Sequence, residues 1–312
     1  MELLGIFNFG ESATVPSPEY EKFYQGAIRK LERAPAVKMS IQEQRKSFED
    51  SVGSYEADPD IQLQRSHLGA IPVLEVAAPK IQRQNTILFF HGGGYRVGSS
   101  WSHRDLMGRL SRASHSLVIG VDYRLAPEHP FPAALEDGLA AYQALLQKVS
   151  SSKHLSLVGV SAGGGLALAL MLALKQRNEP LPACYVGICP WVDLTLSGVT
   201  LETNRGKDLI TKERLKEARD AYCQNHDPKA PFISPTFGDL SHLPPLLIQA
   251  GGREVLLSEI ESLAQRAKKQ GTSVHYEQWP DMLHAWHLFS RDFPEGREAI
   301  QKIGDWMIRH HR

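Results

Sequence analysis

Cysteine is scarce in this chain, whose 312 residues include only Cys184, Cys189 and Cys223. An odd number of cysteines without close C-x-x-C spacing argues against a disulfide framework and against a structural zinc site. Cys184 and Cys189 lie in an apolar run, so we expect them to be buried core thiols. The first residues also lack a basic start and a long apolar core, so we expect no signal peptide. Both observations fit a protein of the reducing cytoplasm.

Charge of one sign is not in excess, because 35 Lys and Arg residues balance 35 Asp and Glu residues. We therefore expect neither nucleic acid nor an anionic membrane as a partner. The uncharged stretch from Leu155 to Leu174 is long enough for a membrane span, but it contains four glycines and two serines. A buried strand followed by a buried helix explains it better, so no stable membrane insertion is expected.

Motifs that bind metals or cofactors are also lacking. There is no H-E-x-x-H run and no cluster of acidic residues with metal-ligand spacing. A glycine-rich run begins at Gly92, but the third glycine of the dinucleotide pattern G-x-G-x-x-G is missing, since Gly98 comes one residue late. We therefore expect neither a cofactor nor a metal.

From residue 61 onward, apolar runs alternate with stretches of helical spacing. The predicted buried strands are Thr86–Phe90, Leu117–Tyr123, Leu155–Val160, Tyr185–Cys189, Leu246–Gln249 and Val274–Gln278. The predicted helices are His103–Ala113, Leu135–Lys148, Gly164–Arg177, Leu256–Lys269 and Arg297–His310. This alternation is typical of β-α-β units, so we expect an α/β fold with a mostly parallel central sheet and helices on both faces. Binding residues of such folds gather at the carboxyl ends of the strands.

Two glycine-rich motifs each follow a predicted strand. The G-x-S-x-G run Gly159–Gly163 lies between an apolar strand and an Ala/Leu-rich helix, which is the context of a nucleophile elbow. A serine hydroxyl is a weak nucleophile, so Ser161 needs a base beside it and hydrogen-bond donors for an oxyanion. The run His91-Gly92-Gly93-Gly94 is expected to bring backbone N–H groups to that charge, a pairing known in esterases.

The histidine base is expected to follow Ser161 in the chain, after the acid. Seven histidines do so. His284 is favoured because it lies in a short loop after the strand Val274–Gln278, where the carboxyl end of the strand places it at the required edge. His287 is the second choice.

The acid, which fixes the histidine tautomer, is expected after the strand Leu246–Gln249. Glu254 is the first carboxylate there and is our choice. Glu259 falls within the following helix, and Asp281 lies three residues before His284, from where it approaches the far ring nitrogen awkwardly. Glu254 could also be a structural carboxylate at a helix N-terminus.

Two regions stand outside the repeating pattern. Apolar spacing predicts helices over Tyr20–Leu31 and Ile41–Phe48, the second with a capping box at Ser40–Glu43. Between Pro190 and Pro245 the alternation breaks, and Lys207–Cys223 is typical of an amphipathic helix. These regions are either structural arms or two halves of a lid over the site.

Taken together, these segments resemble the hormone-sensitive-lipase family of α/β-hydrolases, also called bacterial family IV esterases. The resemblance runs from about residue 60 to the end of the chain. It rests on His91–Gly94, Asp122–Glu128, Gly159–Gly164, Pro190–Asp193 and Asp281–His284. Two departures occur: the family's Asp-Pro-Leu-x-Asp run reads Glu254-Val255-Leu256-Leu257-Ser258, and its His-Gly-Phe reads His284-Ala285-Trp286.

The resemblance implies an α/β-hydrolase fold with a helical cap. Residues 1–60 would supply the N-terminal part of the cap, residues 61–312 the catalytic domain, and residues 195–240 an insertion that completes the cap. It implies Ser161 as nucleophile and His284 as general base, with the glutamate at position 254 replacing the usual aspartate. The N–H groups of the Gly92, Gly93 and Gly94 run and of Ala162 would form the oxyanion hole.

The leading prediction is a serine carboxylic ester hydrolase that works through an acyl-enzyme on short- to medium-chain esters of small molecules. One alternative is a catalytically weak small-molecule receptor of the same fold, against which the presence of His284 argues. An amidase or lactonase with the same triad is another. The sequence leaves the natural ester open, and it leaves open a homodimer of the kind this family often forms through a sheet edge.

Overall fold

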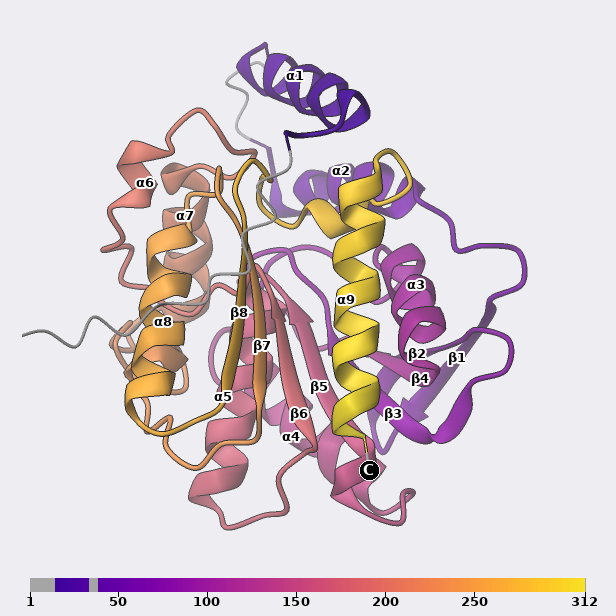
Figure 1. Ribbon diagram of the computed structural model, residues 1–312. Helices are drawn as coiled ribbons and strands as arrows, with labels where there is room; N and C mark the ends of the chain where they lie inside the picture. Colours follow the sequence, from indigo (N-terminus) through magenta and orange to yellow (C-terminus); the bar gives the residue numbers. More distant parts are fainter. Residues whose placement is uncertain (1–14, 34–38, 312) are drawn as a thin grey trace, which may run out of the picture.

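The computed structural model describes residues 15–33 and 39–311, and within them a sheet of eight strands runs through the molecule (Figure 1). The strands are β1 (Gln62–Leu68), β2 (Ile71–Ala77), β3 (Gln82–Phe90), β4 (Ser116–Val121), β5 (Leu155–Val160), β6 (Cys184–Ile188), β7 (Leu246–Gly251) and β8 (Val274–Trp279). Their order is β1-β2-β4-β3-β5-β6-β7-β8. The pairs β1–β2 and β2–β4 are antiparallel, and the others are parallel. The predicted fold class, a mostly parallel α/β sheet, is confirmed.

Helices cover both faces of the sheet (Figure 1). The α-helices of the described residues are α1 (Pro18–Glu32), α2 (Ile41–Ser51), α3 (Arg104–Ser114), α4 (Ala133–Leu146), α5 (Ala162–Gln176), α6 (Thr200–Thr203), α7 (Lys212–Cys223), α8 (Leu257–Lys269) and α9 (Pro294–His310). Apolar side chains of α3 and α9 form one core with the sheet, and those of α4, α5 and α8 form the core on its other face. Every residue of β5, β6 and β7 is buried, as expected of parallel strands covered on both sides.

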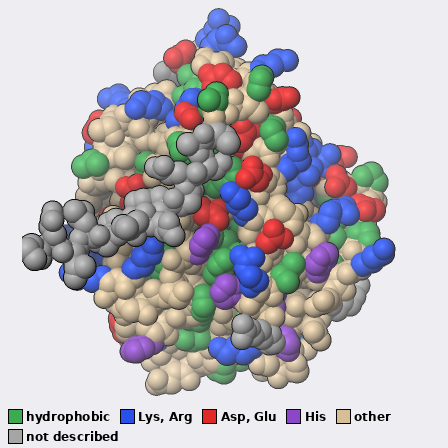
Figure 2. All heavy atoms as spheres, viewed as in Figure 1, with side chains coloured by type: hydrophobic (Ala, Val, Ile, Leu, Met, Phe, Trp, Pro, Cys, Tyr) green, Lys and Arg blue, Asp and Glu red, His purple; other side chains and the backbone are tan. Residues whose placement is uncertain are grey.

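The uncharged stretch Leu155–Leu174 is β5 followed by most of α5. Its apolar side chains are buried inside the protein, as the sequence predicted. No helix in the described residues combines the length and apolar character that a bilayer span would need. The visible face carries interspersed cationic and anionic side chains, in keeping with the zero net charge (Figure 2).

Each predicted strand and helix has a counterpart, but the hairpin β1–β2 was not predicted. Its strands are joined at Gly69, which has a φ of +61°, and β1 lies at the edge of the sheet. The amphipathic helix predicted from Lys207 begins at Lys212 instead, where the side chain of Thr211 caps it. The three cysteines are free and buried, and burial was the expectation for Cys184 and Cys189.

Helices α1, α2 and α6 all lie toward one end of the molecule (Figure 1). Helix α9 starts at this end and runs away from it (Figure 1). His311, just after α9, contacts Ser156 near the start of β5, so the parallel strands begin at the opposite end of the molecule and finish at this one. The predicted capping box of α2 is present, because Ser40 and Glu43 exchange side-chain and backbone hydrogen bonds. The division into cap residues 1–60 and catalytic residues 61–312 stays a prediction, and residues 1–14 and 34–38 lie outside the described ranges.

Candidate active site

Ser161 stands on a sharp turn between β5 and α5. Its backbone has φ of 54° and ψ of −121°, a conformation that non-glycine residues rarely adopt. The Ser161 N–H donates to the carbonyl of Ile188, and its own carbonyl accepts the N–H of Trp191 at 2.9 Å. These bonds, to the last residue of β6 and to the chain just after it, hold the strained turn in place.

The glycines on either side of Ser161 are required by close packing. A Cβ atom at Gly163 would lie 2.1 Å from the carbonyl oxygen of Phe90, and one at Gly159 would lie 2.2 Å from the carbonyl oxygen of Gly163. Both distances are far below van der Waals contact. The G-x-S-x-G pattern therefore reflects the space available around a tight strand-to-helix turn.

The glycine run after β3 lies beside the elbow. A Cβ atom at Gly92 would come 3.5 Å from Cβ of Ser161. The Gly92 N–H donates to Nε2 of His103 at 3.1 Å. Burial lowers the pKa of His103 to about 3, which keeps this ring neutral and able to accept the bond. Tyr123 supports the run from behind, because its hydroxyl donates to the carbonyl of His91 at 2.8 Å.

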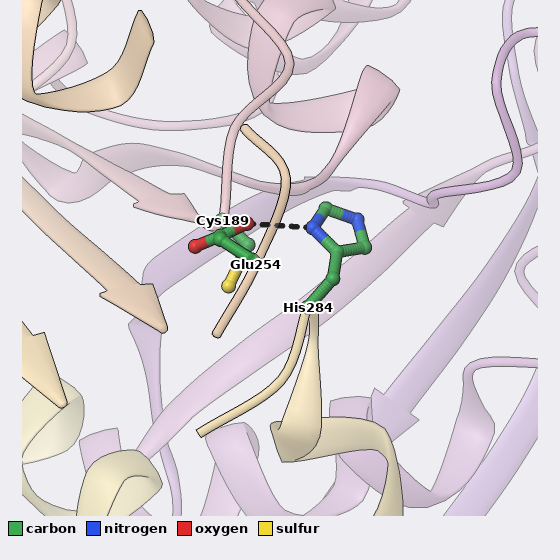
Figure 3. A group of neighbouring side chains, drawn as sticks. All are labelled: Cys189, Glu254 and His284. Carbon is green, nitrogen blue, oxygen red and sulfur yellow. Dashed lines mark hydrogen bonds and ion pairs between the residues drawn. The ribbon is translucent and has the colours of Figure 1, made fainter. Parts of the chain in front are cut away.

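Glu254 and His284 form a buried pair at the ends of β7 and β8 (Figure 3). Nδ1 of His284 donates to Oε2 of Glu254 at 2.7 Å, and Oε1 of Glu254 accepts the N–H of Gly251 at 2.7 Å. Burial disfavours the charged imidazole, but the hydrogen bond and the charge of Glu254 outweigh it and raise the pKa of His284. The pair is thus arranged to stabilise an imidazolium ion.

The two loops that carry this pair are joined through their backbones. The N–H groups of Gly252 and Arg253 donate to the carbonyls of Trp279 and Met282, at 2.8 and 3.0 Å. A Cβ atom at Gly252 would lie 1.8 Å from the carbonyl oxygen of Pro280, so only glycine fits where the loops cross. The separation of acid and base is therefore fixed by main-chain contacts.

Helix α1 contacts the histidine loop through one side chain. The Tyr20 hydroxyl donates to the carbonyl of Asp281 at 2.7 Å and accepts the N–H of Leu283 at 2.9 Å. Tyr20 is fully buried and packs edge-on against Phe293. Tyr20 belongs to the predicted N-terminal helix, but nothing local in the sequence indicates this contact.

The other candidates for acid and base lie elsewhere. Glu259 is buried in α8, where Oε1 accepts the N–H of Gly198 at 3.3 Å. Asp281 pairs with Arg253 at 3.1 Å. Nε2 of His287 contacts Oε1 of Gln249 at 2.6 Å.

Cys189 lies beside the pair of Glu254 and His284, a position that the sequence did not indicate (Figure 3). One ligand atom from each of these residues falls within 4.8 Å of the others. Burial and the nearby Glu254 raise the pKa of the thiol well above its ordinary value, and its sulfur accepts the N–H of Ala285. A neutral thiol and a carboxylate already bound to two N–H groups are a poor donor set for a metal.

Comparison with known proteins places the chain among hydrolases. A family model described as an alpha/beta hydrolase fold matches residues 87–288. An acetyl-hydrolase of Streptomyces hygroscopicus is 43% identical over 234 residues, covering 75% of this chain and 78% of that protein. An esterase of Acinetobacter venetianus is 35% identical, covering 80% and 82%. A solved esterase from the bacterial hormone-sensitive lipase family has a TM-score of 0.91 at 39% identity, covering 96% of this chain and 100% of that one.

Proposed function

The chain belongs to the bacterial hormone-sensitive-lipase family of α/β-hydrolases and is a serine ester hydrolase, and we propose that it works through an acyl-enzyme on Ser161. The observation that carries the proposal is the buried hydrogen bond from Nδ1 of His284 to Glu254. Because Nδ1 holds the proton, Nε2 is left with a free lone pair and is able to act as a base.

In the first half of the reaction, Nε2 of His284 takes the proton of the Ser161 hydroxyl as its oxygen attacks the ester carbonyl carbon. The bond from that carbon to the alcohol oxygen then breaks, and the leaving alcohol takes the proton from His284. In the second half a water molecule gives its proton to His284 and attacks the acyl carbon. The carboxylic acid leaves, and the proton returns to Ser161.

We assign the oxyanion hole to the N–H groups of Gly93, Gly94 and Ala162. The Gly92 N–H, which the sequence also suggested, already donates to His103 and so has another partner. Ser161 Oγ makes no hydrogen bond to any residue within 15–33 and 39–311, and catalytic contacts of this kind often tighten only when substrate binds.

The cap assignment, residues 1–60 together with 195–240, is supported by contacts with the catalytic loops. Helix α2 contributes Arg45, whose guanidinium donates to the carbonyls of Arg96 and Ala126. Helix α7 packs Ala218 against the glycine run, since a Cβ atom at Gly94 would lie 3.1 Å from Cβ of Ala218. Such a cap would set the length of the acyl chain, and the acetyl-hydrolase relative supports short- to medium-chain esters.

Location and assembly complete the proposal. The three free, buried thiols support a reducing cytoplasm. The edge position of β8 supports a homodimer through this strand, which size-exclusion chromatography with light scattering would test.

The direct test is Ser161→Ala, assayed on p-nitrophenyl esters of rising chain length together with matched amides and lactones. We expect kcat to fall on the order of 10⁴-fold or more on every substrate that the wild type cleaves, since the triad acts as a unit. Ser290→Ala, at another buried serine, is the control and should retain activity. If a folded Ser161→Ala protein keeps more than a few per cent of activity, the assignment is wrong.

A further inference from the structure

Two side chains from the segment between β6 and β7 reach the loops of the acid and the base. Nδ2 of Asn204 donates to the carbonyls of Gly252 and Glu254, at 3.1 and 2.9 Å. Four residues later, Oδ2 of Asp208 accepts the N–H of Val255 at 3.0 Å, and its Oδ1 accepts the N–H of His284 at 3.1 Å. One carboxylate therefore joins the residue after the acid to the base itself.

Asp208 is an unusual residue to find there. Its side chain is 1% exposed and has no cationic side chain among its hydrogen-bond partners in the described residues. Its oxygens are satisfied by backbone N–H groups, including that of Leu209 at 2.7 Å. A second buried carboxylate near Glu254 costs free energy, which makes a purely structural use of it expensive.

We propose that Asp208 is a positioning residue of the active site, which fixes the loops of Glu254 and His284 relative to each other and places a second negative charge beside the backbone N–H of His284. This inference rests on the proposed function, in which His284 becomes an imidazolium ion during the reaction. Two anions then act on the developing positive charge, one through a hydrogen bond to Nδ1 and one through space.

Among the groups around His284, the carboxylates of Glu254 and Asp208 carry the charges that act on its imidazole. Burial raises the pKa of the Cys189 thiol and of the Tyr20 hydroxyl well above their ordinary values, so both are neutral. Burial also lowers the pKa of His287 to about 3, so that ring is neutral as well. Arg253 and Asp281, on the adjoining loops, pair with each other.

The charge of Asp208 determines the direction in which it shifts the pKa of His284. Burial raises the pKa of Asp208 to about 6, with His284 opposing the shift, so above that pH the group is an anion. An anion favours the imidazolium form and raises the pKa of His284. Activity needs the neutral imidazole, so kcat/KM rises with pH through this pKa. Removing the charge at position 208 should move that rise to lower pH.

The test compares Asp208→Asn, Asp208→Glu and the control Asp193→Asn over a range of pH. Asn keeps the shape, loses the charge and accepts only one of the two loop N–H groups. We expect kcat to fall about 10- to 100-fold with KM little changed, because orientation and transition-state charge are affected more than binding. The rise of kcat/KM should move to lower pH.

Asp208→Glu keeps the charge but displaces its oxygens, so kcat should fall without that movement toward lower pH. Asp193 is also buried, but its oxygens accept from Thr195 and Ser197, and its substitution should leave both kcat and the pH profile unchanged. Circular dichroism and thermal unfolding establish that each variant is folded.

Wild-type kcat and pH profile in Asp208→Asn would overturn the proposal, and so would a loss confined to KM or an equal loss in Asp193→Asn. If Asp208→Asn does not fold, Asp208→Glu decides: a fall in kcat with an unmoved pH profile supports the proposal, and wild-type kcat contradicts it. Ser161→Ala in the same assay distinguishes a failure of this proposal from a failure of the proposed function. If it is inactive while Asp208→Asn behaves as wild type, only the role of Asp208 is wrong.

Discussion

Replacing Glu254 by glutamine tests the acid more sharply than any other change, because the side chain is fully buried and both of its oxygens are used. Oε1 accepts from Gly251 and Oε2 from His284. Glutamine has the same shape but only one oxygen, so one N–H would face its amide group. An unsatisfied buried donor costs about 1–3 kcal/mol, and we expect the free energy of unfolding to fall by about that amount.

The effect on the rate should be larger. An amide neither stabilises the imidazolium by charge nor enforces the tautomer with a proton on Nδ1, and we expect kcat to fall on the order of 10²–10⁴-fold. This corresponds to about 2.7–5.5 kcal/mol of barrier, more than one neutral hydrogen bond supplies. The assay is the initial rate on the best p-nitrophenyl ester, with urea unfolding measured in parallel.

Glu259→Gln is the matched control. Burial and the nearby Asp193 raise the pKa of Glu259 well above its ordinary value, and its carboxyl group makes no contact with His284. Asp281→Asn is the second control, and both should lose much less activity than Glu254→Gln. If either folded control loses more, Glu254 is not the acid.

Two further outcomes are expected. In Tyr20→Phe the N–H of Leu283 and the carbonyl of Asp281 lose their shared hydroxyl partner. The free energy of unfolding, measured by heat or urea, should therefore fall by about 1–3 kcal/mol, and kcat should fall more than KM changes. A wild-type kcat would show that α1 does not position the histidine loop. For the wild type, kcat/KM should rise with pH through the raised pKa of His284, since the base must be neutral; a profile that falls over that range would contradict the assignment of His284.

The parts of the fold that the sequence predicted have strong local signals. Buried parallel strands are continuous apolar runs, and the elbow needs glycine on both sides of Ser161. The edge strand β1 was missed because most of its residues are polar and partly or fully exposed, so the chain shows no apolar run there. A strand of this kind is defined by its partner β2 and not by its own composition.

The missed site residues have a different cause. Tyr20 and Leu283 are 263 positions apart, and Asp208 and His284 are 76 apart, so no local pattern relates them. Asp208 fell within the amphipathic helix that the sequence predicted over Lys207–Cys223. In the structure it precedes α7 and is buried against the catalytic loops. Chain order predicted Glu254 and His284, but it carries no information on the side chains that hold their loops.

The contact between Tyr20 and the histidine loop has a consequence for how the protein is made. On the ribosome, helix α1 emerges long before Asp281 and Leu283, which follow Tyr20 by 261 and 263 residues. Tyr20 therefore cannot reach its buried position until the loop of Asp281 and Leu283 has been synthesised. Contacts of such high sequence separation form late and slow the approach to the native state. During refolding, hydrolytic activity should thus return after the sheet has formed, and it would report the docking of α1 onto the loop of Asp281 and Leu283.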